Sequence, residues 1–105
     1  MNNKFDDWDD VKSKIIVLAE KNSPLLIKTV KLSAPVFCSK LLIRQPKLVR
    51  TELTFCIYLK LKYNTKEIAK FLNVSPKAIQ NRKNRLRKKL NIASSLDLYQ
   101  WFDSL

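Results

Sequence analysis

The 105 residues of this chain include no glycine and no histidine. Glycine adopts positive φ at low cost, so its absence predicts a chain without tight turns and without Gly-rich phosphate loops. The absence of histidine removes the common zinc ligand sets. We therefore predict that the protein is not an enzyme and holds no cofactor or metal. Helices joined by short connections suit this composition, which favours an all-α fold.

Cysteine is scarce as well, and Cys38 and Cys56 both lie among apolar residues without a CxxC pairing. We interpret them as buried free thiols in a reducing compartment, with a single disulfide in a secreted protein as the weaker alternative. The acidic N-terminal sequence MNNKFDDWDD lacks the apolar region of a signal peptide. No run of about 18 apolar residues occurs, so the sequence predicts no membrane span.

Basic residues, by contrast, are abundant, and the formal net charge is +12. Residues 1–48 carry nine Lys/Arg against five Asp/Glu, whereas residues 49–105 carry twelve against four. Such asymmetry indicates a polyanionic partner for the second half of the chain. The alternative is that the positive charge only keeps a small helical protein soluble.

Residues 1–47 form the first predicted unit, an N-terminal helical segment. Apolar residues at steps of three and four predict a helix over residues 5–20, whose acidic start suits the helix dipole. Ser23–Pro24 resembles a helix start for residues 25–32, and Pro35 begins a third helix that ends before Pro46. Packing on the rest of the chain is the favoured role of this segment, with dimerisation and partner docking as alternatives. Its inward-facing residues are predicted to be Phe5, Trp8, Val11, Ile15, Leu18, Val36, Phe37, Leu41 and Leu42.

Residues 48–105 form the second predicted unit, with helices over about 48–62, 65–72 and 76–90 and a last helix capped by Ser94 or Ser95. Asn64 and Glu67 have capping-box spacing, and Ser75–Pro76 is a typical helix start. Two short helices joined by a three-residue turn, with the small Ala69 at their close approach, are typical of a helix-turn-helix.

The helix over residues 76–90 has the composition of a recognition helix. Positions 77–89 hold seven basic residues and no acid, with Gln80, Asn81 and Asn84 between them. Arginine, asparagine and glutamine can form paired hydrogen bonds with base edges, while basic side chains neutralise phosphates. We assign base reading to Lys77, Gln80, Asn81 and Asn84, and phosphate contacts to Arg85, Arg87 and Lys88.

Other functions remain as alternatives. A protein-interaction module of helix-turn-helix shape could dock RNA polymerase or a sensor protein, but such a surface favours exposed apolar or acidic residues. A basic helix on an anionic membrane needs a broad apolar face with aromatic residues, and structured-RNA readers usually display aromatic residues for stacking. Residues 76–90 contain no aromatic residue. Duplex DNA is therefore the favoured partner.

The run NTKEIAKFLNVSPKAIQNRKNRLRKKLNI, residues 64–92, resembles the C-terminal DNA-binding domain of LuxR-type transcription regulators. It aligns without a gap to that family's approximate pattern S-x-K-E-I-A-x-x-L-x-[IV]-S-x-x-T-V-x-x-H-x-x-x-[IL]-x-x-K-L-x-[IV]. Upstream, Leu48-x-x-x-Glu52 matches the family's L-T-x-x-E start. The chain departs from the pattern at Lys62 (usually glycine), Val49 and Ala78 (usually threonine) and Arg82 (usually histidine).

The resemblance implies a four-helix DNA-binding domain over residues 48–105 of a cytoplasmic, nucleoid-associated bacterial regulator. It supports the groove-facing residues named above and adds Lys89 as a phosphate contact. It also implies a homodimer, for which the last helix is the candidate interface through Leu98, Trp101, Phe102 and Leu105. The alternative is that these four side chains only cover the domain's own core.

Residues 1–47 leave no room for a receiver or effector-binding domain. We therefore expect no small-molecule ligand, and regulation through abundance, dimerisation or a protein partner. The initial Met1 favours a complete regulator over the end of a longer one.

Overall fold

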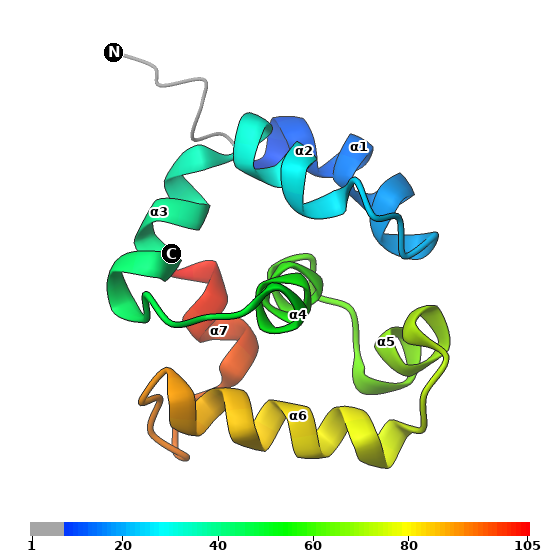
Figure 1. Ribbon diagram of the computed structural model, residues 1–105. Coiled ribbons are helices and arrows are strands. Elements are labelled where there is room, and N and C mark those ends of the chain that lie inside the picture. The colour runs from blue at the N-terminus through cyan, green and yellow to red at the C-terminus, as the bar shows by residue number, and fades with distance from the viewer. Residues whose placement is uncertain (1–7) are drawn as a thin grey trace.

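The computed structural model describes residues 8–105, and these residues form seven helices and no strand (Figure 1). The predicted all-α fold is confirmed. In Figure 1, α1 and α2 lie above α4, α3 lies to its left, α5 lies to its right, and α6 runs below it. Helix α7 packs beside α4. The helices are α1 (Trp8–Glu20), α2 (Leu26–Ser33), α3 (Pro35–Arg44), α4 (Arg50–Lys60), α5 (Thr65–Leu72), α6 (Pro76–Lys89) and α7 (Leu98–Asp103).

Helices α5 and α6 begin at the residues that the sequence predicted. The Asn64 side chain accepts a hydrogen bond from the Glu67 amide at 2.8 Å, and the Glu67 carboxylate accepts one from the Asn64 amide at 2.9 Å. The Ser75 hydroxyl accepts from the Ala78 amide at 3.1 Å, and Pro76 occupies the first helical position. These side chains satisfy amides that a helix start leaves without partners, so the predicted caps are confirmed.

Two other predicted helix starts were wrong. Helix α2 begins at Leu26, and the Ser23 hydroxyl instead accepts from the Leu25 amide within the preceding turn. Helix α7 is capped by Asp97, whose carboxylate accepts from the Tyr99 amide at 3.0 Å. The predicted caps Ser94 and Ser95 lie in a turn closed by a backbone hydrogen bond from Leu96 to Ala93. The start of the first predicted helix, including Phe5, lies outside the described residues.

The prediction that a chain without glycine lacks tight turns was also wrong. Asn22, Lys62, Asn73 and Asn91 have φ between 48° and 69°, and each follows a helix. After each of them, the next amide donates to the carbonyl five residues earlier at 2.9–3.2 Å, as in a Schellman C-cap. Asparagine tolerates this conformation better than other non-glycine residues. Three asparagines therefore replace glycine, and Lys62 adopts a conformation that its Cβ disfavours.

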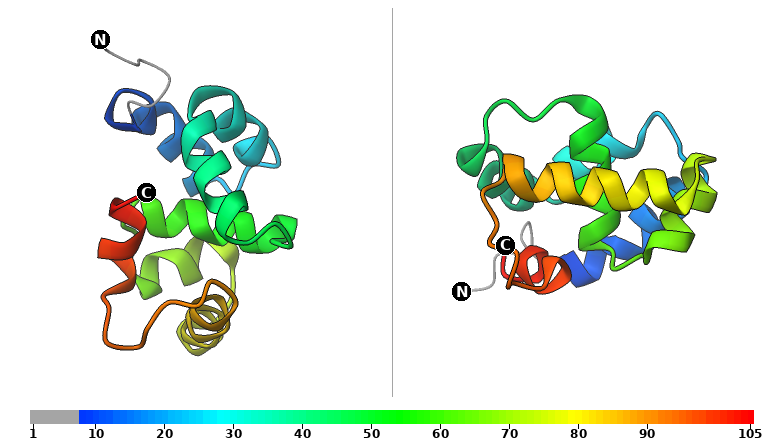
Figure 2. Two further views of the ribbon diagram at one scale, coloured as in Figure 1. Left: turned by 90° about the vertical axis from the view of Figure 1, so that its left-hand side faces the viewer. Right: turned by 90° about the horizontal axis from the view of Figure 1, so that it is seen from below.

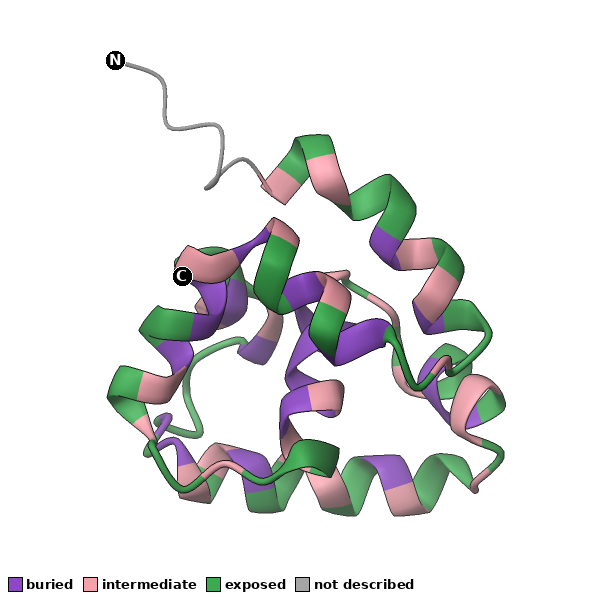
Figure 3. Cartoon of the chain, turned by 45° about the horizontal axis from the view of Figure 1, so that its top comes forward, coloured by how far each residue is buried: buried purple, intermediate pink, exposed green. Residues whose placement is uncertain are grey.

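One continuous apolar core joins all seven helices, and α4 lies at its centre (Figures 1 and 3). Seven of the eleven residues of α4 are buried. The Tyr58 side chain is fully buried and its hydroxyl donates to the Ala19 carbonyl of α1. Ile15, Val30 and Leu41 bring α1, α2 and α3 into the same core. The N-terminal helices thus support α4, which in turn supports the helices below it.

Lys60 is the only buried charged side chain among residues 8–105. Its ammonium donates to the Phe102 carbonyl of α7 at 3.1 Å and lies 5.7 Å from the ring centres of Trp8 and Phe37. Burial lowers the pKa of Lys60, while the carboxylate of Asp103 acts in the opposite direction. This side chain joins α4 to α1, α3 and α7.

Cys38 and Cys56 are both buried and unpaired, which confirms the prediction of free thiols. Burial raises the pKa of both thiols, so they remain protonated and unreactive at neutral pH. None of the helices described over residues 8–105 is long and apolar enough to cross a bilayer.

Candidate nucleic-acid interface

Helix α6 directs one row of polar side chains away from the protein. At about 100° per residue, positions three, four and seven apart share a face of a helix. Every member of this row is exposed, and the row contains no acid. In Figure 3 the exposed positions of α6 alternate with buried ones along its length. The row, called the outer face below, consists of Lys77, Gln80, Asn81, Asn84, Arg85 and Lys88.

The opposite edge of α6 holds it against α5 and α4. Ile79 and Leu86 are 0% and 3% exposed, and both belong to the core. On α5, Ala69 is 3% exposed, as expected for a small residue at the close approach of two helices. The left-handed Asn73 and the bond from the Val74 amide to the Ala69 carbonyl close the turn between α5 and α6. The predicted helix-turn-helix arrangement is therefore present.

Lys83, although basic, belongs to the inner side of α6. Its ammonium donates to the hydroxyl of Thr65, the first residue of α5, at 2.7 Å and to the Tyr99 hydroxyl of α7 at 2.9 Å. The Tyr99 hydroxyl donates in turn to the Tyr63 carbonyl at 2.7 Å. Burial lowers the pKa of Lys83, partly opposed by the carboxylate of Asp97.

This network, which the sequence did not predict, joins α6 to α5 and α7. The one signal in the sequence is the position of Lys83, which helical spacing places beside Ile79 and Leu86. Its partners could not be predicted, because Thr65 and Tyr99 lie 18 and 16 residues away in the chain.

Arg87, predicted as a phosphate contact, makes its contacts within the protein. One guanidinium nitrogen donates to the carbonyls of Ala93 and Leu96 at 2.9 and 2.8 Å. Arg87 is half-buried and holds the connection between α6 and α7. The other residues assigned to phosphates from their position on the helix, Arg85 and Lys88, are exposed.

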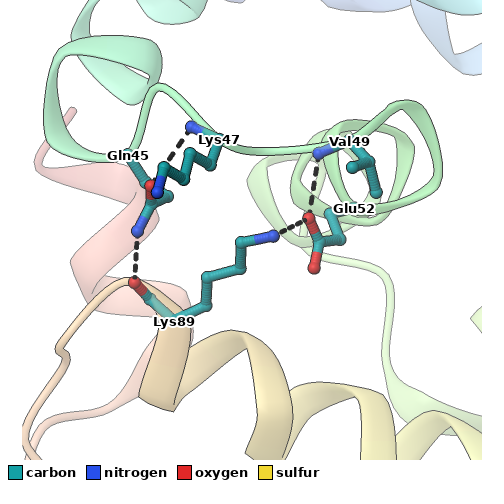
Figure 4. A network of polar contacts seen from close by, with 5 residues as sticks. All are labelled: Gln45, Lys47, Val49, Glu52 and Lys89. Carbon is teal, nitrogen blue, oxygen red and sulfur yellow. Dashed lines mark hydrogen bonds and ion pairs between the residues drawn. The ribbon is translucent and has the colours of Figure 1, made fainter.

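Lys89, which the resemblance marked as a phosphate contact, is paired with an acid of α4 (Figure 4). Its ammonium lies 2.7 Å from Oε1 of Glu52, which also accepts from the Val49 amide at 2.9 Å. The Gln45 side chain donates to the Lys89 carbonyl at 3.0 Å and accepts from the Lys47 amide at 3.1 Å. These contacts fix the segment between α3 and α4 beside the C-terminal end of α6.

Glu52 supplies the negative charge of this network. Burial acts to raise the pKa of its carboxyl group, but the hydrogen bonds from Lys89 and Val49 and the charge of Lys89 outweigh burial and lower it. Glu52 thus remains ionised and neutralises Lys89, so Lys89 adds little free positive charge to the surface.

The four residues of the predicted dimer interface fall into two groups. Leu98 and Phe102 are buried in the chain's own core, at 4% and 0% exposure. Trp101 and Leu105 are partly exposed, and the guanidinium of Arg44 lies 5.6 Å from the Trp101 ring centre. Only Trp101 and Leu105 are therefore available to a second copy in this structure.

Residues 58–102, from the end of α4 to α7, match the family model described as bacterial regulatory proteins of the luxR family. This segment is a LuxR-type helix-turn-helix domain. Its match covers the cap of α5, the turn, α6 and most of α7. No curated protein and no solved structure matches the chain. The match supports a DNA-binding regulator of transcription, and the luxR family consists of regulators rather than enzymes.

The structure shows the surroundings of the four residues at which the chain departs from the LuxR pattern. Lys62 has φ 69°, which explains why glycine usually stands there. Val49 is the N-cap residue of α4 and offers no side-chain acceptor, so one of the two hydrogen bonds of a capping box is lost. The other is present, because the Glu52 carboxylate accepts from the Val49 amide. Ala78 and Arg82 lie between the outer face and the core, and both are half-buried.

Proposed function

We propose that the LuxR-type domain reads duplex DNA by inserting the outer face of α6 into the major groove. The observation that carries this proposal is the composition of that face. Six exposed residues that are all basic or carboxamide-bearing form one row along a helix, while the large apolar residues of that helix, Ile79 and Leu86, are buried in the core. An α-helix fits the major groove of B-DNA, and such side chains match the groove's hydrogen-bonding pattern.

We assign base reading to Lys77, Gln80, Asn81 and Asn84, because N-terminal residues of a recognition helix reach deepest into the groove. Arg85 and Lys88 are assigned to phosphates. Arg87 and Lys89 are assigned a supporting role. Arg87 donates to two carbonyls of the α6–α7 connection, and Lys89 is paired with Glu52 of α4. The regulator would act in the bacterial cytoplasm at the nucleoid.

We further propose that residues 48–105 bind DNA and that two copies act on paired half-sites, in contact through Trp101 and Leu105. Residues 1–47 then serve chiefly to support α4. The shared core supports this role, since α2 packs on α4 and the Tyr58 hydroxyl joins α4 to α1. RNA polymerase or a sensor protein is the partner expected under the alternative function, in which the helix-turn-helix is a protein-interaction module.

The test is selection of genomic DNA fragments on the purified chain at about 0.15 M salt, where non-specific phosphate binding is weakened, followed by sequencing. We expect an enriched motif, and two copies of it about one helical turn apart if the protein is a dimer. Retention without a motif would contradict base reading. No retention at all would favour the alternative of a protein-interaction module.

A further inference from the structure

A groove of about 310 Å³ lies between the start of α4 and the middle of α6. Its apolar lining includes Phe55 and Leu86, which are buried. Its polar lining consists of Thr51 and Glu52 from α4 and Arg82 and Arg85 from α6. Neither Thr51 nor Arg82 belongs to the outer face of α6.

The two arginines of the groove carry positive charge that the protein does not neutralise. Neither the Arg82 nor the Arg85 side chain makes a hydrogen bond or an ion pair with another residue of the described range 8–105. The one carboxylate that lines the groove, Glu52, is engaged by the Lys89 ammonium at 2.7 Å. Two guanidinium groups beside a neutralised acid favour an anion from outside the chain.

The start of α4 adds to the positive electrostatic potential at this groove. Val49 occupies the N-cap position and has no side-chain acceptor for the first-turn amides, whereas a threonine there would supply one. The Thr51 side chain is exposed at the groove and provides a hydroxyl donor. The positive end of the α4 dipole therefore lies beside Arg82 and Arg85 without a capping hydroxyl between them.

The groove lies along one flank of α6, which contributes Arg82, Arg85 and Leu86 to its lining. Seen from below in Figure 2, the segment that leads into α4 runs along one side of α6. When α6 lies in the major groove, a DNA strand that borders the groove runs along a flank of the helix. We propose that Arg82, Arg85 and Thr51 bind a phosphodiester of that strand, an inference that rests on the proposed function.

The experiment compares the variants Arg82→Gln, Arg85→Gln and Thr51→Val with the control Lys14→Gln, which removes one exposed charge from α1. Dissociation constants are measured for the selected duplex and an unrelated duplex over a range of salt concentrations. We expect each arginine variant to lose about tenfold in affinity for both duplexes, as for loss of a hydrogen bond to a charged group. The dependence of log K on log salt should decrease by about one for each arginine.

Thr51→Val should lower affinity for both duplexes by about threefold without changing the salt dependence, because the hydroxyl carries no charge. Circular dichroism and thermal melting of each variant verify that the fold is retained. A duplex with a single neutral methylphosphonate linkage provides a second measurement, which does not depend on protein variants. At one linkage, the neutral substitution should weaken DNA binding by the wild-type chain. It should not weaken DNA binding by the Arg82→Gln variant any further.

The inference is overturned if Arg82→Gln and Arg85→Gln bind like Lys14→Gln, or if they lose affinity for the selected duplex alone. Failure of the proposed function has a different signature. In that case the wild-type chain shows no sequence preference, while both arginine variants still bind more weakly and with a smaller salt dependence. The groove would then bind phosphate although α6 does not read bases.

Discussion

The two sides of α6 use the same types of residue in different ways. On the inner side, Lys83, Arg87 and Lys89 bind hydroxyl, carbonyl and carboxylate groups of the protein itself. On the outer face, Lys77 and Lys88 are exposed and make no such contact in the described structure. Nearly half of the basic residues of α6 therefore position the helix, and fewer are available to DNA than the sequence count indicates.

The difference teaches that neighbouring helices decide the role of a basic residue in a helix-turn-helix. Lys83 and Lys77 are chemically identical, but Thr65 and Tyr99 lie beside Lys83. Substitutions on the inner side should therefore change the stability of the fold. Substitutions on the outer face should change DNA binding alone.

The largest expected effect concerns the apolar part of the inner side. Ile79→Ala should destabilise the protein by about 2–5 kcal/mol, because a fully buried side chain leaves a cavity. Urea denaturation measures the free energy of unfolding. Asn84→Ala on the outer face is the control and should change it by less than about 0.5 kcal/mol. Equal losses for the two variants would contradict the division of α6 into two sides.

On the outer face, Asn81→Ala should weaken binding to the selected duplex by about 1–3 kcal/mol, with little effect on an unrelated duplex. Lys88→Ala should weaken binding to both duplexes alike and lower the salt dependence by about one. Titrations of both duplexes at several salt concentrations measure these quantities. If the two variants behaved alike, the assignment of separate base and phosphate contacts would be wrong.

A smaller effect is expected for the polar part of the inner side. Lys83→Met keeps the length of the side chain but removes the hydrogen bonds to Thr65 and Tyr99, so it should lower stability by about 1 kcal/mol. Lys88→Met is the matched control and should leave thermal stability unchanged. A Lys83→Met variant as stable as the control would show that this network contributes nothing to the position of α6.

The smallest expected effect is the pH dependence of the Glu52–Lys89 pair. The folded-state pKa of Glu52 is lowered, so its contribution to stability is present above the unfolded value near 4.5 and is lost as pH falls through the folded pKa. Because both side chains are about 30% exposed, we expect only about 0.5 kcal/mol. Relative to wild type, Glu52→Gln should be less stable at pH 7 and equally stable at pH 2. A difference independent of pH would contradict this account.

The sequence predicted the elements whose signals are local. Asn64, Glu67, Ser75 and Pro76 mark helix starts through contacts within three residues, and the bounds of α5 and the start of α6 followed from them. The start of α7 was missed because two serines compete with Asp97, and only the turn closed by Ala93 and Leu96 decides between them.

Features that depend on distant residues could not be predicted. The roles of Lys83, Arg87 and Lys89 depend on hydrogen-bonding partners in other segments, and the groove at Arg82 depends on the position of α4. The absence of glycine was misleading for a different reason. Three asparagines and one lysine adopt the left-handed conformation that glycine usually supplies.

The most direct test of the central claim, that the outer face of α6 reads base sequence, is a repeat of the DNA selection with an Asn81→Arg variant. Asparagine pairs with adenine and arginine with guanine in the major groove. We predict that the selected motif changes towards guanine at one position and keeps all others. An unchanged motif, or the loss of every preference with affinity retained, would contradict the account.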